Sequence, residues 1–293
     1  MARARFSIHV IIVGLLFLFG WQALTNRAGW CAKFADSDFQ ANRIRLQSYF
    51  LDPAATVILT GSSVTARLVP SYFTGTATPR VANLGLDGCT VAFSLEIAAE
   101  RPVRGQCIIV ENYSLLYDNA ANEKNIRPIY SEEELMLPGK LDAFRVSIRP
   151  TALLYSALKE RKDRGGGTPG MRSLACRKMA DLTQDEIAQL NRSRRAITKL
   201  RNMGATIVLL RIPCGEAEGP AGQREPDFFS EFAAELNAPE IDLPKLMRTK
   251  GIALRYSDGL HMVGSTALAA SEVLGDELAV LFSVQGDKAP RAR

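Results

Sequence analysis

The chain has 293 residues, a length typical of one or two domains. Hydrophobic residues make up 47% and charged residues 23%, which excludes a disordered tail, a collagen-like chain and a polytopic membrane protein. The 36 Lys and Arg exceed the 31 Asp and Glu by five, and no basic run is interleaved with aromatic residues, so we expect no nucleic-acid partner. Two histidines and five cysteines without a CxxC pair argue against a metal site. We expect no cofactor.

The N-terminus predicts a membrane anchor. Residues 1–5 contain two arginines, and the apolar run IHVIIVGLLFLFGWQAL follows over residues 8–24. A helix of this length measures about 25 Å, just short of the ~30 Å hydrocarbon core. No convincing cleavage site follows, so residues 6–30 are expected to form an uncleaved signal anchor; a cleaved signal peptide and a buried soluble helix are the alternatives. The positive-inside rule then predicts a single-pass inner (cytoplasmic) membrane protein whose residues 1–5 are cytoplasmic and whose C-terminal domain is periplasmic.

The rest of the chain alternates between strand and helix patterns. Short runs rich in apolar residues predict strands at 56–60, 80–84, 107–111 and 206–212, and a fifth, short strand is expected near 240–242. Helical spacing predicts helices at 36–50, 90–100, 183–203 and 263–282. Strands separated by helices imply βαβ units and a mostly parallel sheet covered on both faces, an α/β three-layer sandwich. We expect one domain over residues 36–283, followed by a disordered basic tail over 284–293.

One segment, residues 113–180, does not follow this alternation. It contains no good strand pattern, a helix is predicted near 141–162, and a glycine-rich loop lies at 164–170. Long insertions within a compact domain are usually functional or mobile. We interpret the segment as an inserted helical cap, with a surface excursion without a role as the alternative.

Polar and small residues follow the first three strands. The loop after the first strand holds Ser63, the next holds Gly88, and Asn112 follows the third. Because the carboxyl ends of parallel strands share one edge, we expect these loops to lie side by side. A serine at a strand-to-helix turn, a backbone N–H group of a glycine and an amide are what acyl transfer needs as nucleophile and oxyanion donors. Each residue alone is common in turns.

A carboxylate and an imidazole precede the last helix. Asp258 and His261 are three residues apart, and His261 is the only histidine outside the apolar run, since His9 lies within it. A carboxylate at this spacing can fix the tautomer of the imidazole and leave its other nitrogen to take a proton from a serine. The alternative is a helix N-cap with an exposed histidine.

With these residues in place, the sequence resembles the SGNH (GDSL-like) hydrolases over residues 54–282. The strand that ends in Gly-Ser-Ser looks like the first block of the family, with the nucleophile on Ser63 and with Ser62 in place of the family's aspartate. Residues 83–88 match the Asn-x-Gly-x-x-Gly pattern of the second block, which places the oxyanion glycine on Gly88.

The remaining two blocks follow in the family's order. The third block keeps only its amide, at Asn112, without the glycine and the following aspartate of the family. The Asp-x-x-His block is present at Asp258 and His261 and is followed by an apolar helix. The resemblance thus implies the flavodoxin-like SGNH fold, a catalytic triad and an oxyanion hole. The triad would be Ser63, Asp258 and His261, and the oxyanion donors Ser63, Gly88 and Asn112.

The resemblance also implies what the protein acts on. Together with export and a membrane tether, it indicates a serine esterase or O-acyl(acetyl)transferase of the envelope-polysaccharide branch, acting on a cell-envelope or exported polysaccharide. Substrates would be an acylated polysaccharide or a small ester, and a transferase would need a membrane acyltransferase partner. Hydrolase and transferase share one constellation, so the sequence leaves this choice open.

Several rival hypotheses remain from the same residues. The main one is a catalytically inactive SGNH-like subunit that binds polysaccharide or acts in assembly. A Rossmann protein is disfavoured because no G-x-G-x-x-G follows the first strand. A cysteine enzyme built on Cys89 is disfavoured because free cysteines are mostly small buried hydrophobes. Cys176 and Cys214 are candidates for a disulfide, and Arg211 is expected to form a salt bridge rather than contact substrate.

Overall fold

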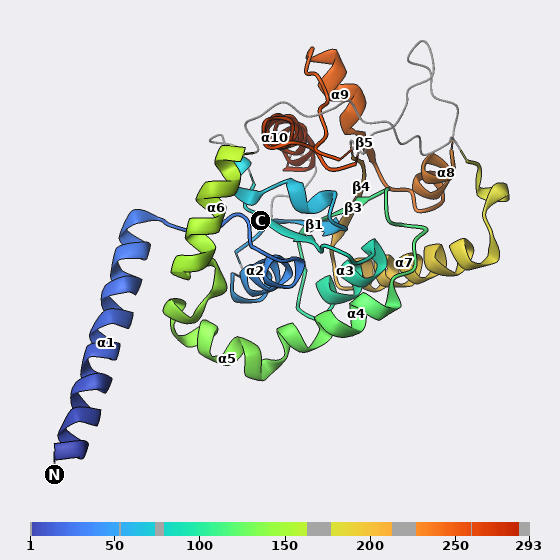
Figure 1. The fold of residues 1–293 in the computed structure, drawn as a ribbon. Coiled ribbons are helices and arrows are strands. Elements are labelled where there is room, and N and C mark those ends of the chain that lie inside the picture. The colour runs from blue at the N-terminus through green and yellow to red at the C-terminus, as the bar shows by residue number, and fades with distance from the viewer. Residues whose placement is uncertain are drawn as a thin grey trace, which may run out of the picture.

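A five-stranded parallel sheet forms the centre of the computed structural model, which describes residues 2–52, 54–73, 79–162, 177–212, 227–258 and 260–286 (Figure 1). The strand order is β2-β1-β3-β4-β5, and all four neighbouring pairs are parallel. The predicted strands are confirmed, each displaced by at most one residue. Their bounds are β1 (Val57–Gly61), β2 (Val81–Gly85), β3 (Cys107–Glu111), β4 (Thr206–Arg211) and β5 (Glu240–Asp242).

Helices flank the sheet; β1 to β4 are buried over nearly their whole length, whereas β5 is buried only at Ile241. Within β1, Ile58 belongs to one apolar cluster, whereas Val57 and Leu59 belong to another. The first cluster includes residues of α2 (Asp38–Leu51), α3 (Val91–Ala98), α7 (Gln184–Asn202) and α8 (Phe228–Glu235). The second includes residues of α9 (Leu243–Thr249) and α10 (Gly264–Gly286). Burial on both faces explains why β1, β3 and β4 are largely continuous apolar runs rather than alternating ones.

The helix starts follow side-chain caps. Thr90 accepts a hydrogen bond from the Phe93 N–H at the start of α3, and Thr183 forms a capping box with Glu186 at the start of α7. These helices agree with the predicted ones to within a few residues. The last helix, α10, extends to Gly286, beyond the predicted end at 282. The last seven positions of the predicted basic tail, 287–293, lie outside the described residues.

The insertion is more helical than the sequence pattern indicated. It contains α4 (Ala120–Ile126), α5 (Glu132–Lys140) and α6 (Pro150–Lys162), joined by 3₁₀ turns (Figure 1). The helix expected over 141–162 begins only at Pro150, a residue favoured at the first helical position. The turns η4 (Asp142–Phe144) and η5 (Val146–Ile148) precede it. The predicted glycine-rich loop, 164–170, lies outside the described residues.

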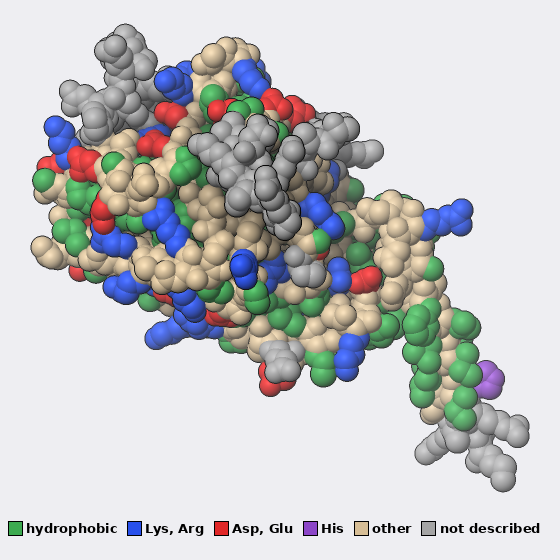
Figure 2. Space-filling view, turned by 180° about the vertical axis from the view of Figure 1, so that it is seen from behind, with side chains coloured by type: hydrophobic (Ala, Val, Ile, Leu, Met, Phe, Trp, Pro, Cys, Tyr) green, Lys and Arg blue, Asp and Glu red, His purple; other side chains and the backbone are tan. Residues whose placement is uncertain are grey.

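One N-terminal helix, α1 (Ala2–Ala28), is long and apolar enough over Ser7–Ala28 to cross a membrane. It projects from the rest of the molecule, and hydrophobic side chains cover its exposed surface (Figures 1 and 2). Its last turns contact the domain: the Trp21 indole N–H donates to the carbonyl of Ile148 at 2.8 Å, and Thr25 is buried. The C-terminal end of α1 therefore packs against the insertion.

A close approach at Gly85 brings the segment after β1 over the end of β2. A Cβ atom at this position would lie 2.7 Å from the Thr65 carbonyl carbon and 2.9 Å from the Ala66 Cα. These atoms are backbone and cannot move away cheaply, so Gly85→Ala is expected to lower the free energy of unfolding by about 1–3 kcal/mol. Thermal unfolding measures this change. Gly139→Ala is the control, because its Cβ would meet only the flexible end of Leu51; an equal loss in both variants would contradict the prediction.

Candidate active site

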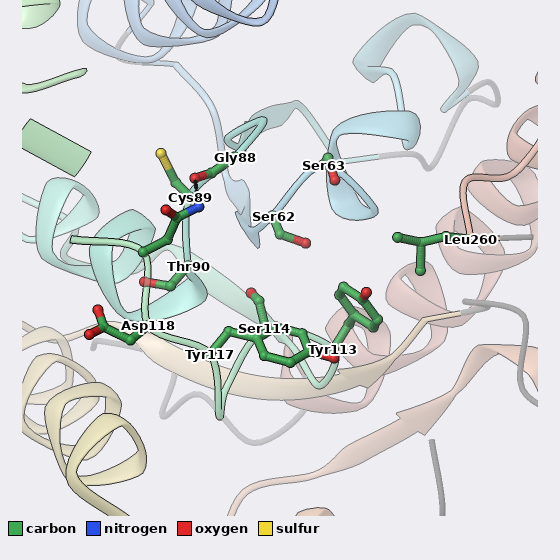
Figure 3. A pocket seen from close by; sticks show the side chains of 11 residues that line it. Ser62, Ser63, Gly88, Cys89, Thr90, Tyr113, Ser114, Tyr117, Asp118 and Leu260 are labelled. Carbon is green, nitrogen blue, oxygen red and sulfur yellow. Dashed lines mark hydrogen bonds between the residues drawn. The ribbon is translucent and has the colours of Figure 1, made fainter. Parts of the chain in front are cut away.

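The loops that follow β1, β2 and β3 lie side by side at the carboxyl edge of the sheet and border a pocket of about 270 Å³ (Figure 3). Gly61, which ends β1, pairs in register with Gly85, which ends β2, so the loops that follow start level with each other. Ser63 lines the pocket from the first loop and Gly88 from the second. Leu260 adds an apolar side chain from the loop before α10. The parallel topology thus places residues distant in sequence at one site.

Ser63, His261 and Asp258 form a chain of hydrogen bonds. The His261 Nε2 atom lies 2.8 Å from the Ser63 Oγ atom, and its Nδ1 atom lies 2.6 Å from the Asp258 Oδ2 atom. The imidazole is largely shielded, with 18% of its side chain exposed, whereas Asp258 is 53% exposed. The three side chains that the sequence singled out therefore lie within hydrogen-bond distance of one another.

The loop around Asp258 is braced by its own backbone. The Asp258 Oδ1 atom accepts the N–H groups of Leu260 at 3.0 Å and of His261 at 2.7 Å. Ser257 N–H donates to the His261 carbonyl at 2.8 Å, which closes the turn. Two backbone donors thus hold the carboxylate in place through one oxygen, and the other oxygen contacts the imidazole.

These contacts set the protonation state of Asp258. Partial burial alone would raise its pKa, but hydrogen bonds from the backbone and imidazole of His261 and from the Leu260 N–H outweigh this and lower the pKa from 3.8 to about 2. Because the pKa is depressed in the folded state, the stability this group contributes is fully present above pH 3.8 and is lost as the pH falls through about 2. The carboxylate is therefore ionised at neutral and mildly acidic pH.

An ionised Asp258 dictates the tautomer of His261. A carboxylate only accepts hydrogen bonds, so the imidazole places its proton on Nδ1 and donates to Asp258. Its Nε2 atom then carries a lone pair directed at the Ser63 hydroxyl, 2.8 Å away. This arrangement can remove a proton from Ser63 and stabilise the imidazolium that results.

Two residues that line the pocket have backbone N–H groups without a hydrogen-bond acceptor in the described part of the chain. Neither the Ser63 N–H nor the Gly88 N–H has an acceptor among the residues that the structure describes. Gly88 has a φ of 71°, a conformation that favours glycine, and its carbonyl accepts the side-chain amides of Asn119 and Asn122. The conformation of the loop is therefore held through the Gly88 carbonyl, and the two N–H groups are not used in these contacts.

Asn112 is not brought to the pocket. Its side-chain oxygen accepts the Ile212 N–H at 3.1 Å, its own N–H donates to Leu210 at 3.1 Å, and it is not among the residues that line the cavity. Here the side chain joins the ends of β3 and β4, which differs from its expected role as an oxyanion donor. Asn119 lines the pocket instead. Sequence reasoning missed Asn119, although an Asp-Asn pair before a short helix is a recognisable cap signal.

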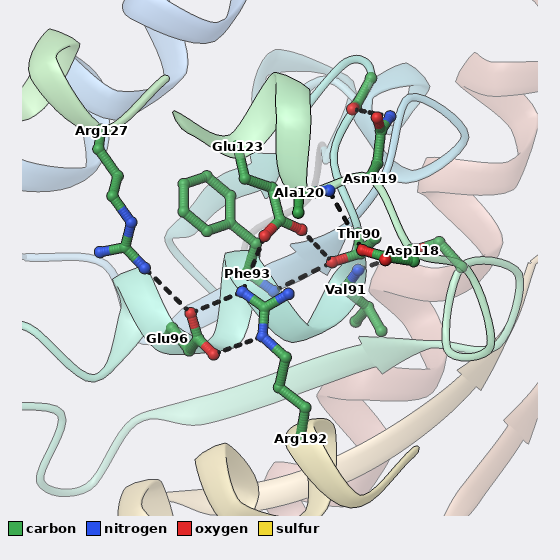
Figure 4. A network of polar contacts seen from close by, with 12 residues as sticks. Thr90, Val91, Phe93, Glu96, Asp118, Asn119, Ala120, Glu123, Arg127 and Arg192 are labelled. Carbon is green, nitrogen blue, oxygen red and sulfur yellow. Dashed lines mark hydrogen bonds and ion pairs between the residues drawn. The ribbon is translucent and has the colours of Figure 1, made fainter. Parts of the chain in front are cut away.

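A network of charged side chains holds the element that carries Asn119 (Figure 4). Arg192 of α7 pairs with both oxygens of Glu96 on α3, at 2.6 and 2.8 Å, and with Glu123 of α4 at 2.8 Å. Glu123, which is buried, also accepts the hydroxyl of Thr90 at 2.6 Å. Through these contacts α4 is tied to the helix that starts at the pocket.

Cys89 and Arg211, the other two candidate residues, are both buried. Burial, with the charges of Glu123 and Asp87, raises the pKa of the Cys89 thiol to about 12, so the thiol is protonated at neutral pH. Arg211 is buried and donates to Asp227 at 2.6 Å, as the expected salt bridge requires. The possible disulfide partners Cys176 and Cys214 lie outside the described residues. Within the described part of the chain, no cluster of three His, Cys, Asp or Glu side chains could hold a metal.

Comparisons with family models, with curated proteins and with solved structures give no match.

Proposed function

We propose that this protein is a membrane-anchored, extracytoplasmic serine esterase or O-acyl(acetyl)transferase that acts on a cell-envelope or exported polysaccharide. The observation that carries the proposal is the continuous hydrogen-bond chain from Ser63 through His261 to Asp258 beside a pocket. Nucleophile, base and orienting carboxylate within hydrogen-bond reach are the signature of covalent acyl transfer.

The reaction begins with Ser63. Its Oγ atom bonds to the ester carbonyl carbon while its proton passes to Nε2 of His261, and the carbonyl electrons move onto the oxygen. The tetrahedral intermediate collapses, the C–O bond to the alcohol breaks, and His261 returns the proton to the leaving oxygen. Water or a sugar hydroxyl then attacks the acyl-serine, with His261 again as the base.

The oxyanion is stabilised by backbone donors. The open N–H groups of Ser63 and Gly88 supply two hydrogen bonds at the pocket. A donor of this kind typically lowers the barrier by ~3–4 kcal/mol. Since Asn112 is engaged between strands, the proposed oxyanion hole consists of these two groups.

The fold supports membership of the SGNH hydrolases. The order β2-β1-β3-β4-β5 is the flavodoxin-like order, in which ligands bind at the carboxyl edge of the strands. Two apolar clusters with different helices support a three-layer sandwich. The order along the chain of serine, glycine, aspartate and histidine agrees with the family's first, second and last blocks.

The position at a membrane supports an envelope substrate. α1 has the length and apolarity of a span, and its last turns are fixed to the insertion through Trp21. The two arginines within residues 1–5 support a cytoplasmic N-terminus, and the proposal accordingly takes the domain to be periplasmic and held to the inner membrane of a bacterium. An anchored enzyme meets polysaccharide during export, and as a transferase it would take its acyl group from a membrane acyltransferase partner.

The pocket also offers a surface on which a sugar ring can pack. Tyr113 and Tyr117 line it as an edge-to-face pair, with ring centroids 5.2 Å apart, and Tyr117 is 44% exposed (Figure 3). Asp118 and Asn119 add hydrogen-bonding groups for hydroxyls beside them. An aromatic face with adjacent polar groups suits a saccharide, whose rings have apolar faces and polar edges.

Tyr117→Ala is expected to raise KM for an acetylated oligosaccharide about fivefold, because the lost apolar contact is worth about 1 kcal/mol. The kinetic constants for 4-nitrophenyl acetate are expected to stay unchanged, since this ester has no sugar ring to pack on Tyr117. Tyr117→Phe is the matched control, because it keeps the ring. Equal losses on both substrates would show that Tyr117 supports the fold rather than the saccharide.

The engagement of Asn112 by Ile212 favours one competing hypothesis, an inactive subunit that binds polysaccharide. Turnover of 4-nitrophenyl acetate by the purified full chain in detergent separates the two, because an inactive module releases no nitrophenolate above the Ser63→Ala background. Adding an unacetylated oligosaccharide and detecting its acetylated product by mass spectrometry then separates transferase from hydrolase. Absence of both reactions would contradict the proposed function.

A further inference from the structure

A buried carboxylate lies beneath the loop that carries Ser63. Glu111 ends β3, is 0% exposed, and is surrounded by donors from two loops. Its Oε1 atom accepts the Ser62 N–H at 2.8 Å and the Ser114 hydroxyl at 2.6 Å. Its Oε2 atom accepts the Thr65 N–H at 3.3 Å and the Thr65 hydroxyl. The carboxylate therefore joins the loops after β1 and β3 by four hydrogen bonds.

These contacts lie on both sides of Ser63 in the sequence. Ser62 precedes Ser63 and Thr65 follows it by two residues, and both donate a backbone N–H to the same carboxylate. The backbone on either side of Ser63 is thus fixed relative to β3. This fixes both groups that the reaction takes from Ser63, namely its hydroxyl and its N–H.

Strand β1 leaves room for this carboxylate. A Cβ atom on Gly61 would lie 2.5 Å from both the Cδ and the Oε2 atoms of Glu111. Any larger residue at the end of β1 would force the carboxylate away from the donors of the loop. Glu111 can therefore keep its hydrogen bonds to the loop only if position 61 is a glycine.

We propose that Glu111 is a positioning residue for the reaction, which sets the conformation of the loop over Ser62–Thr65 and with it the attack geometry of the Ser63 hydroxyl and the direction of the Ser63 N–H. The proposal rests on the proposed function of Ser63 as the nucleophile. Glu111 acts through the loop and does not touch the substrate. A displacement of about 1 Å at a reacting group can cost about 10²-fold in rate.

Glu111→Gln tests the proposal with almost no change in shape. A carboxamide has one accepting oxygen and one donating NH₂ group. Each carboxylate oxygen of Glu111 accepts a backbone N–H, from Ser62 on one side and Thr65 on the other, and a backbone N–H cannot reverse its role. In the glutamine variant, one of these two backbone N–H groups therefore faces the side-chain NH₂ group, which is also a donor. The two donors repel, and the loop must move.

The measured quantities are the rate of fluorophosphonate labelling, kcat and KM for 4-nitrophenyl acetate, the melting temperature, and amide hydrogen exchange of the peptide that contains Ser63. For folded Glu111→Gln we expect labelling and kcat to fall about 10²-fold with KM changed less than about threefold, and faster exchange in this peptide. Asp227→Asn is the matched control, because it converts another buried carboxylate that pairs with Arg211 and does not line the pocket. It is expected to lower the melting temperature but to keep the labelling rate.

The outcomes are distinct. Labelling of Glu111→Gln at the wild-type rate, or an equal loss in Asp227→Asn, overturns the proposal. If Glu111→Gln does not fold, Thr65→Val removes one hydroxyl donor, and we expect about tenfold slower labelling; an unchanged rate overturns the proposal. If wild-type protein reacts with neither probe nor ester, the proposed function fails and the catalytic role of Glu111 fails with it, while hydrogen exchange still shows whether the carboxylate holds the loop.

Discussion

Ser63→Ala is expected to lower kcat for ester turnover by about 10⁶-fold. The substitution removes the only atom that bonds to the acyl group, and His261 then has no hydroxyl from which to take a proton. Because the groups of a triad act as a unit, Ser63→Ala combined with His261→Ala is expected to be no slower than Ser63→Ala alone. Steady-state kinetics with 4-nitrophenyl acetate measure both effects.

Two serine substitutions control for this result. Ser193 is buried in α7, and its hydroxyl has no hydrogen-bond partner among the described residues, so Ser193→Ala is expected to leave kcat unchanged. Ser62 lies next to Ser63, but among the described residues its hydroxyl makes one contact, accepting the Val64 N–H at a long 3.4 Å, so Ser62→Ala is expected to keep kcat within about tenfold. If kcat collapsed in Ser62→Ala while Ser63→Ala kept its activity, the nucleophile would be Ser62 and the assignment of Ser63 would be wrong.

Asp258→Asn is expected to lower kcat by about 10⁴-fold through the tautomer of His261. The Asp258 Oδ1 atom accepts two backbone N–H groups, so the oxygen of the asparagine must occupy that position. Its NH₂ group then faces the His261 Nδ1 atom, which can only accept from it, and the imidazole proton moves to Nε2. In that tautomer the imidazole cannot accept the proton of Ser63.

This mechanism has a direct spectroscopic readout. The chain has two histidines, so ¹⁵N NMR can distinguish His261 from His9 and is expected to show the Nδ1–H form in wild type and the Nε2–H form in Asp258→Asn. Asp242→Asn is the control, because Asp242 caps α9 through one bond to the Lys245 N–H and an amide oxygen can replace it. Because the pKa of Asp258 is about 2, Asp258 is also expected to contribute no acid limb to the pH–rate profile above about pH 4. An unchanged tautomer together with an unchanged kcat would remove Asp258 from the site.

Much of the sheet could be predicted because its signals are local. The first four strands are short, largely apolar runs that are buried over nearly their whole length, and such runs are hard to place elsewhere. The parallel topology then determines which loops meet, so Ser63 and Gly88 could be grouped without coordinates. His261 stood out because the one other histidine, His9, lies in the apolar run of the anchor.

The remaining features depend on tertiary contacts. Asn112 has the residue type of an oxyanion donor, but its side-chain oxygen accepts the N–H of Ile212, which directly follows β4 and lies 100 positions further along the chain. Glu111 ends an apolar strand, and only the folded loops reveal that four donors surround it. The helices α4 and α5 are short and polar, so they have little periodicity of their own, and α4 is held to α3 and α7 by Arg192.

Mapping the site of fluorophosphonate attachment tests the central claim most directly. The full chain in detergent is treated with the probe and digested, and the modified peptide is sequenced by mass spectrometry. A single adduct on Ser63, lost in Ser63→Ala and strongly reduced in His261→Ala, is the predicted result. Equal labelling of wild type and Ser63→Ala, or an adduct on any other residue, would contradict the assignment of Ser63 as the nucleophile.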